Sequence, residues 1–208
     1  MSYATSSLGG LLDRFGSGEP VPGGGPAAGI AAALGTSLVV MAATLAKAGA
    51  GTDGAGDLEA AIARLRSLQN DLLSLADDDS VAYASVLAAY RLPKQTPAEK
   101  AARAAAIEVA MQAATDVPLG MMRSCAQALR EAIEVTERVP RRAHVDLAIG
   151  IELIDASLRG CRLCVDANAR VLTTAEHRSL APIESARIHA EATAHLERIG
   201  AIQKSRQP

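Results

Sequence analysis

The chain has 208 residues, of which 49% are hydrophobic but only 2% aromatic, and its formal net charge is −2. This shortage of aromatic residues excludes most β-sandwich and barrel designs, whereas Ala and Leu, which supply much of the apolar content, are strong helix formers. Acidic and basic residues are interspersed without a basic stripe, so nucleic-acid binding is not expected. We predict an all-α, multi-helix bundle in a single domain over residues 1–208.

Hydrophobic spacing and helix-capping signals predict the elements in chain order. They are a short amphipathic helix at 5–15, an Ala-rich helix at 27–47, a flexible Gly-rich connector at 49–56, a long helix at 57–90, a helix at 97–117, a continuation to 137 that Pro118 either kinks or restarts, a helix at 145–172, and a last helix from Pro182 to 199. Thr96, Pro97 and Glu99 form a capping box at the start of one of these helices. The tail at 203–208 is expected to fray.

The Ala-rich stretch at 27–46 contains no charge and has the length of a membrane span. It has few strongly inserting residues, and neither a cluster of positive charges nor an aromatic belt lies beside it. We therefore expect no membrane insertion, but a helix buried on all sides at the centre of a bundle or of a homodimer.

Three cysteines, Cys125, Cys161 and Cys164, occur in a chain in which no signal peptide is recognised. We expect reduced thiols and a cytoplasmic location. Cys161 and Cys164 have the spacing of a metal-binding pair, but no second pair exists, so apolar packing is favoured and no metal is expected.

A glycine loop, defined here as residues 22–26, precedes the Ala-rich helix and reads Pro22-Gly23-Gly24-Gly25-Pro26. Three glycines let backbone N–H groups approach a ligand closely, and a helix N-terminus favours an anion or a carbonyl oxygen. The loop lacks the spacing of the phosphate- and dinucleotide-binding motifs. A tight turn without a ligand remains the alternative to a binding site.

Asp146 opens a helix of mostly apolar residues, where it either matches the helix dipole or serves as an acid–base group at the edge of a pocket. His144 is a second candidate proton carrier, or a solvated loop histidine. Charged residues at 152, 155, 159, 162 and 166 share one helix face. They form either a solvated row of ion pairs or a surface on which Arg159 meets an anionic ligand or a second subunit.

Four stretches of the chain resemble the folate cyclodeaminase/cyclohydrolase family. They are Pro20–Gly25 with the Ala-rich helix after it, Asp79 with Ala82-Tyr83 and Ala89–Lys94, Ala114–Leu119, and Asp146 followed by Leu158-Arg159 and Asn168. Their order and spacing, over about residues 8 to 172, make the resemblance fairly specific.

The resemblance implies an all-α homodimer with a folate pocket near the glycine loop and no tightly bound cofactor. It implies either hydrolysis of 5,10-methenyl-tetrahydrofolate to 10-formyl-tetrahydrofolate or cyclodeamination of 5-formimino-tetrahydrofolate. Asp146 is the implied catalytic carboxylate, and His144, by its position in the chain, is a second candidate catalytic residue. The implied substrate-binding residues are Pro22, Gly23, Gly24, Gly25, Asp79, Tyr83, Tyr90, Lys94, Arg159 and Asn168, with Lys94 meeting the folate tail and Tyr83 or Tyr90 stacking on a ring.

The chain departs from the family after the Ala-rich helix, where an Asn, a lysine cluster and a Tyr are replaced by the residues at 44–52. These departures leave two alternatives open. One is a diverged enzyme that performs amidine or imine chemistry on another substrate, and the other is a non-catalytic ligand-binding or dimeric interaction protein.

Overall fold

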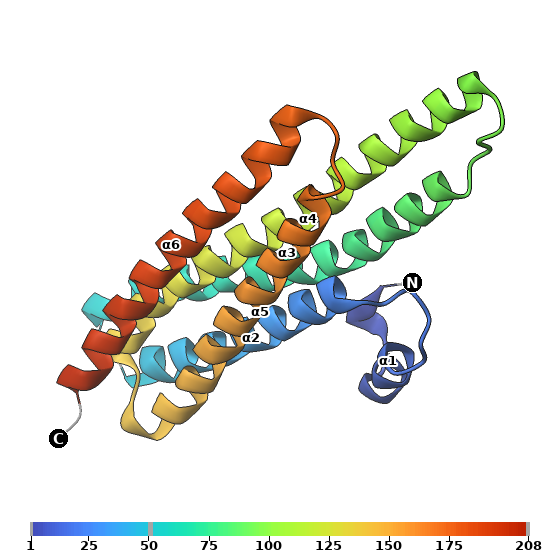
Figure 1. Cartoon of the computed structure of the whole chain (residues 1–208). Coiled ribbons are helices and arrows are strands. Elements are labelled where there is room, and N and C mark those ends of the chain that lie inside the picture. Colours follow the sequence, from blue (N-terminus) through green and yellow to red (C-terminus); the bar gives the residue numbers. More distant parts are fainter. Residues whose placement is uncertain (1, 50–51, 207–208) are drawn as a thin grey trace.

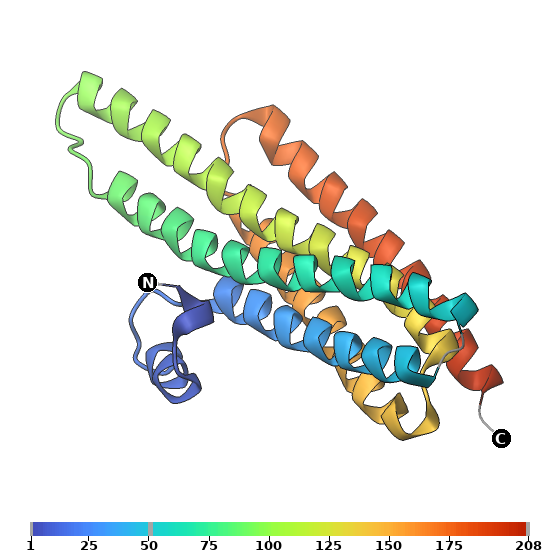
Figure 2. The same ribbon diagram turned by 180° about the vertical axis from the view of Figure 1, so that it is seen from behind.

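The computed structural model describes residues 2–49 and 52–206, and within them the chain is an all-α bundle without strands, as predicted (Figure 1). The elements are η1 (Tyr3–Thr5), α1 (Leu8–Phe15), α2 (Gly24–Gly49), α3 (Thr52–Tyr90), α4 (Pro97–Arg138), η2 (Arg141–Ala143), α5 (His144–Ala169) and α6 (Ala175–Ser205). The long helices α3 and α4 form a hairpin whose tip extends beyond the rest of the bundle (Figures 1 and 2).

The Ala-rich helix α2 packs against α3 and α5, and glycines set how closely it approaches them. A Cβ atom built on Gly35 would lie 2.6 Å from the carbonyl oxygen of Gly150 on α5, and one built on Gly29 would lie 3.1 Å from the Cβ of Ala76 on α3. Any larger residue at Gly35 would therefore push α2 and α5 apart.

Within one chain, α2 is not buried on all sides, so the predicted burial at the centre of a single bundle is wrong, whereas burial in a homodimer stays a prediction. One strip remains open to solvent, where Leu34 is 57% and Met41 37% exposed. By length and a mean hydropathy of 1.9, α2 meets the criteria for a membrane span, but core helices meet the same criteria, and 44% of the apolar window is buried in the bundle.

Leucines, methionines and alanines from α2 to α6 form the main core. Its largest fully buried side chains are Leu58, Leu65, Leu72, Met121, Met122, Leu129, Leu147, Ile154, Leu158, Ile188 and Ile199. Each such side chain contributes roughly 1.5–3 kcal/mol of burial free energy. A smaller cluster with Val86 and Met111 fills the hairpin between α3 and α4.

Both internal prolines lie within continuous helices, which excludes the predicted restart at Pro118 and corrects the predicted helix start at Pro182. Pro118 cannot donate a backbone hydrogen bond to the carbonyl four residues before it, that of Ala114. The side-chain amide of Asn168 donates to this carbonyl at 2.7 Å instead, so α4 continues through Pro118 as one helix.

Pro182 lies inside α6, which begins earlier, at Ala175. Glu108 of α4 fixes this start, because its carboxylate accepts hydrogen bonds from the backbone N–H groups of Thr173 and Thr174 at 2.8 and 3.1 Å. These bonds also lower the pKa of Glu108 to about 2. Such a tertiary cap leaves no local signal in the sequence of α6.

Two further predicted boundaries shift. Residues 52–56 of the predicted connector are the first turn of α3, whereas 50–51 lie outside the described residues. The helix α6 extends into the tail that was predicted to fray, as far as Ser205. The capping box is confirmed, because the Thr96 hydroxyl accepts from the N–H of Glu99 and the Glu99 carboxylate accepts from the N–H of Thr96.

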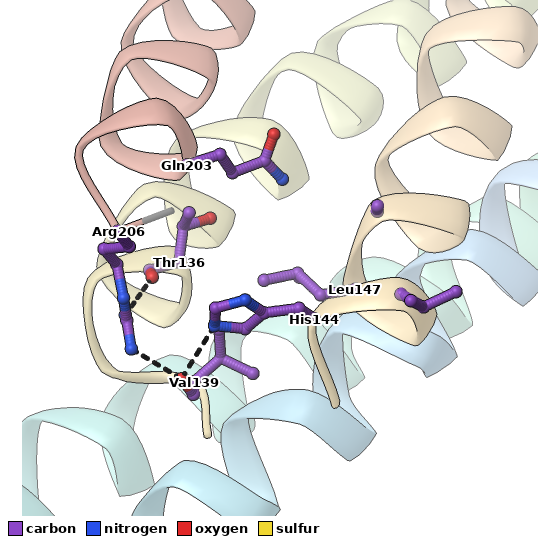
Figure 3. Close-up of a pocket in the computed structure, with 8 residues that line it drawn as sticks. Thr136, Val139, His144, Leu147, Gln203 and Arg206 are labelled. Atoms are coloured by element: carbon purple, nitrogen blue, oxygen red, sulfur yellow. Dashed lines mark hydrogen bonds between the residues drawn. The ribbon is translucent and has the colours of Figure 1, made fainter. Parts of the chain in front are cut away.

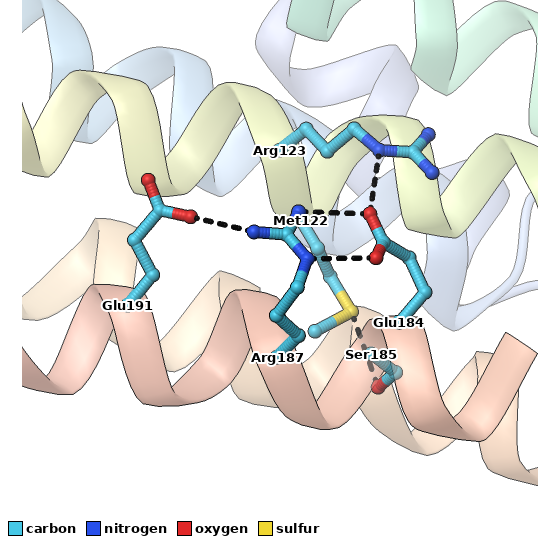
Figure 4. Close-up of polar contacts among 6 residues, drawn as sticks. All are labelled: Met122, Arg123, Glu184, Ser185, Arg187 and Glu191. Atoms are coloured by element: carbon cyan, nitrogen blue, oxygen red, sulfur yellow. Dashed lines mark hydrogen bonds and ion pairs between the residues drawn. The ribbon is translucent and has the colours of Figure 1, made fainter.

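A charged cluster joins α4 to α6 on the outside of the bundle (Figure 4). Glu184 accepts hydrogen bonds from Arg187, at 2.8 Å, and from Arg123 on α4, at 3.4 Å. The two guanidinium groups, Arg187 foremost, lower the pKa of Glu184 to about 2. The exposure of both arginines keeps the contribution of these pairs to stability small.

Candidate active site

The glycine loop closes one side of a cavity of about 310 Å³ at the end of the bundle where α2 begins and α5 ends. The cavity is lined by Pro20, Val21, Gly23, Gly24, Gly25 and Pro26 before and in the first turn of α2, by Asp79, Ser80 and Tyr83 on α3, by Ala114 on α4, and by Cys164, Ala167 and Asn168 on α5. Pockets that bind small molecules begin at about this size.

Asp79 is the carboxylate of this cavity, and it lies directly against the glycine loop. A Cβ atom on Gly25 would overlap the Asp79 carboxylate, so only glycine allows the carboxylate to lie against this first turn of α2. Asp79 makes no hydrogen bond with other residues in the described part of the chain, and burial raises its pKa to about 6. A carboxyl group with this pKa exchanges protons readily near neutral pH.

Asn168 forms the opposite wall and is fixed by the backbone. Its amide nitrogen is held by the carbonyl of Ala114, the carbonyl that Pro118 leaves free. This bond orients the side-chain amide, whose carbonyl oxygen has no partner among residues 2–49 and 52–206 and is available to a ligand.

The N-terminal segment supports the α3 wall of the cavity. Asp77 accepts hydrogen bonds from the Ser2 hydroxyl at 2.6 Å and from the Tyr3 N–H at 2.8 Å, and the Tyr3 hydroxyl lies 2.6 Å from Ser80 Oγ. The Arg14 guanidinium covers the Tyr3 ring at 5.4 Å. The sequence analysis missed Ser80 because its role depends on this long-range contact.

Cys164, on the α5 wall, is the second cavity residue, after Ser80, that sequence reasoning did not assign to the site. Burial and the nearby Asp79 charge raise the pKa of its thiol, so it is protonated at neutral pH. Cys161 packs in the core, with its sulfur 3.7 Å from that of Met121. In the described ranges no three His, Cys, Asp or Glu residues are grouped as metal ligands.

Tyr83 lines the cavity, whereas Tyr90 and Lys94 lie farther along the hairpin. Tyr90 is two helical turns beyond Tyr83, about 10 Å along α3, and Arg103 covers its ring at 5.3 Å. Lys94 is exposed in the connection between α3 and α4. This connection forms the tip of the hairpin (Figure 1). These two residues are therefore outside the cavity but on the same side of the bundle.

Asp146 and His144, the implied catalytic pair, lie at the other end of α5. Twenty-two residues separate Asp146 from Asn168, about 33 Å along the helix. Around the start of α5 is a second cavity of about 220 Å³, where His144 Nε2 lies 3.2 Å from the carbonyl oxygen of Val139 (Figure 3). Arg206 donates to the same carbonyl at 2.7 Å. Within one chain, neither Asp146 nor His144 reaches the glycine loop.

Arg159 lies between the two ends of α5, on the outside. Its side chain is 59% exposed and pairs with Asp155, one turn earlier, at 3.1 Å. Arg162 and Asp166 approach each other at 4.0 Å. The charged residues at 152–166 that share one face of α5 therefore form, in part, ion pairs within this helix. Arg159 does not line the glycine-loop cavity.

Known proteins resemble this chain over most of its length. The family model of formiminotransferase-cyclodeaminase matches residues 7–186. A methenyltetrahydrofolate cyclohydrolase of Methylorubrum extorquens is 37% identical over 167 residues, 78% of each chain. The formimidoyltransferase-cyclodeaminase of Mus musculus is 28% identical over 83% of this chain but only 32% of its own length. The crystal structure of a formiminotetrahydrofolate cyclodeaminase from Thermotoga maritima, 20% identical, shares the fold with a TM-score of 0.87 over 97% of this chain and 98% of that one. The chain belongs to the formiminotransferase-cyclodeaminase family, as its motifs predicted.

Proposed function

We propose that this protein is a one-carbon folate enzyme that hydrolyses 5,10-methenyl-tetrahydrofolate to 10-formyl-tetrahydrofolate. The observation that carries the proposal is the Asp79 carboxylate, half-buried against Gly25 with a pKa raised to about 6. The similarity to the Methylorubrum cyclohydrolase, over most of both chains, supports this reaction.

The substrate's methenyl bridge is a cation, and its hydrolysis requires a group that stabilises positive charge and transfers protons. The Asp79 carboxylate attracts the cationic bridge and accepts a proton from the attacking water as the oxygen bonds to the methenyl carbon. The bond from this carbon to N5 then breaks, N5 takes up one proton, and the second proton of water leaves to solvent. The products are 10-formyl-tetrahydrofolate and a proton.

The remaining groups of the cavity suit the pterin ring. The unpaired oxygen of Asn168 accepts a hydrogen bond from a ring nitrogen, and Tyr83 stacks on an aromatic part of the ligand. The folate tail then extends along α3 past Tyr90, so that its carboxylates meet the Lys94 ammonium group near the hairpin tip. In this arrangement Arg159 has no role within the same subunit.

Cyclodeamination of 5-formimino-tetrahydrofolate is the second candidate. The vertebrate relatives at 25–28% identity are named formimidoyltransferase-cyclodeaminases, and the same carboxylate chemistry serves both reactions. The higher identity and reciprocal coverage of the cyclohydrolase relative favour hydrolysis. We further propose that the enzyme acts as a cytoplasmic homodimer, since α2 leaves Leu34 and Met41 uncovered and all three cysteines are free.

The test follows the loss of 5,10-methenyl-tetrahydrofolate absorbance with wild type, Asp79→Asn and Asp78→Asn. Asp78 is the matched control, because it is adjacent and exposed and does not line the cavity. We expect a rate above buffer for wild type, a decrease of about 10²–10⁴-fold for Asp79→Asn, and little change for Asp78→Asn.

A parallel assay measures ammonia released from 5-formimino-tetrahydrofolate. Ammonia release without hydrolysis of 5,10-methenyl-tetrahydrofolate would show that the protein is a cyclodeaminase and not a cyclohydrolase. Absence of both activities, with no folate-induced rise in melting temperature, would favour the non-folate or non-catalytic alternative.

A further inference from the structure

Ser80 brings a hydroxyl group to the glycine-loop cavity, one residue after Asp79 on α3. Serine and threonine side chains inside helices can donate to the carbonyl four residues earlier, as those of Thr115 and Ser157 do at 2.7 Å. Among residues 2–49 and 52–206, Ser80 makes no such bond, and its one hydrogen-bond partner is the Tyr3 hydroxyl, at 2.6 Å. The contact with Tyr3 therefore takes the place of the local bond that commonly occupies a helical serine.

The surroundings of Tyr3 decide which of the two hydroxyl groups donates. Tyr3 is only 5% exposed, and in the part of the chain that the structure describes its hydroxyl has no hydrogen-bond partner besides Ser80. If Ser80 donated, the phenol proton would be buried without an acceptor, which is unfavourable. The Arg14 guanidinium, 5.4 Å from the ring centroid, also draws electron density from the phenol and strengthens it as a donor. Tyr3 therefore donates to Ser80 Oγ, and the Ser80 proton is free to bind a ligand in the cavity.

The N-terminal segment holds Tyr3 at two points of α3. The Asp77 carboxylate accepts hydrogen bonds from the Ser2 hydroxyl and from the Tyr3 N–H, at 2.6 and 2.8 Å, and Ser80, nearly one turn later, contacts the phenol. This segment lies at the end of the bundle where α2 begins (Figures 1 and 2). A donor whose direction is fixed in this way stabilises charge without reorganising during the reaction.

We infer that Ser80, oriented by Tyr3, donates a hydrogen bond to the oxygen that becomes the formyl oxygen, and that the pair thereby favours hydrolysis over cyclodeamination. The inference rests on the proposed function. Attack of water gives a carbinol, whose hydroxyl loses its proton to solvent as the bond from carbon to N5 breaks and the carbonyl forms. Negative charge develops on this oxygen, and a hydrogen-bond donor stabilises it, as in an oxyanion hole. Ser80 keeps its own proton, so one water is consumed and one proton is released as before.

The two candidate reactions differ at this oxygen. In cyclodeamination N10 attacks the formimino carbon and ammonia leaves, so no oxygen bonds to the reacting carbon. A donor for such an oxygen therefore contributes to hydrolysis alone, whereas the Asp79 carboxylate meets positive charge in both reactions. Ser80 is accordingly a catalytic residue specific to hydrolysis, and Tyr3 is a positioning residue that acts through it.

Steady-state hydrolysis of 5,10-methenyl-tetrahydrofolate by Ser80→Ala, Tyr3→Phe and the double variant tests the inference. We expect Ser80→Ala to lower kcat about 10²-fold and to change KM by less than about threefold, because the lost bond forms in the transition state. Tyr3→Phe keeps the ring but removes the hydroxyl, so kcat should fall about tenfold through the misdirected serine. The same change should have no further effect when Ser80 is already Ala.

Ser85→Ala is the matched control and should keep the wild-type kcat, because Ser85 is an exposed serine of the same helix that does not line the cavity. Circular dichroism and melting temperatures of all variants separate a loss of chemistry from a loss of fold. Any release of ammonia from 5-formimino-tetrahydrofolate by wild type should change by less than about threefold in Ser80→Ala.

Three results would overturn the inference while the proposed function stands. They are a wild-type kcat in folded Ser80→Ala, an equal loss of hydrolysis and ammonia release in this variant, and an undiminished effect of Tyr3→Phe in the Ser80→Ala background. Wild type that does not hydrolyse 5,10-methenyl-tetrahydrofolate would instead overturn the proposed function, and the role of Ser80 with it.

Discussion

Replacing Asp79 by Asn should make the protein more stable at neutral pH, even though we expect the same change to remove activity. In the folded chain burial raises the pKa of Asp79 from 3.8 to about 6. Each pKa unit corresponds to about 1.4 kcal/mol, so the difference represents at most about 3 kcal/mol of unfavourable free energy once Asp79 is ionised. Asp79 is only half-buried and lies at the N-terminus of α2, where solvent and the helix dipole both favour the charge, so we expect about 1–2 kcal/mol.

The difference in stability between Asp79→Asn and wild type depends on pH. Because the pKa of Asp79 is higher in the folded state, the protonated group gives its full stabilisation below about pH 4, and this is lost as the pH rises through about 6. Asn resembles the protonated acid at every pH. The stability difference between Asp79→Asn and wild type should therefore be near zero at pH 4 and about 1–2 kcal/mol in favour of the variant at pH 7.5.

Urea unfolding of both proteins at these two pH values measures the difference directly. Folding also lowers the pKa values of Glu108 and Glu184. Both residues are present in both proteins, so their contributions to the pH dependence of stability cancel in the comparison. Asp78→Asn serves as the control, because Asp78 is adjacent and exposed and does not line the cavity. The reasoning fails if Asp79→Asn is no more stable than wild type at pH 7.5, or if its advantage is as large at pH 4.

Three further substitutions probe the cavity and the helix contacts. Gly25→Ala should displace the carboxylate of the site and lower activity at least tenfold in the absorbance assay, with circular dichroism unchanged, because a flexible side chain can move aside. Asn168→Leu should destabilise the protein by about 1–3 kcal/mol in urea, because the carbonyl of Ala114 loses its donor. Gly35→Ala should lower stability by about 1–3 kcal/mol, whereas Gly200→Ala, which meets no neighbour, should raise it slightly; equal effects would contradict the close contact between helices.

Most of the fold could be predicted because helix formation is largely local in this chain. The Ala and Leu periodicity and the capping box at Thr96 identified the helices, and their bounds differ mainly at prolines. Proline breaks were the default expectation, since the ring removes a hydrogen bond. What overrides this default at Pro118 is the amide of Asn168, fifty residues later, which no local pattern contains.

The candidate site could be predicted in part. Residues 23–26 of the glycine loop, Asp79, Tyr83 and Asn168 meet in one cavity because α2, α3 and α5 come together at one end of the bundle, whereas Pro22 does not line this cavity. Ser80 and Cys164 were missed, since a serine and a cysteine on long helices give no signal until the packing is known. The sequence also singled out Asp146, but nothing in a linear pattern tells whether two motifs meet within one chain.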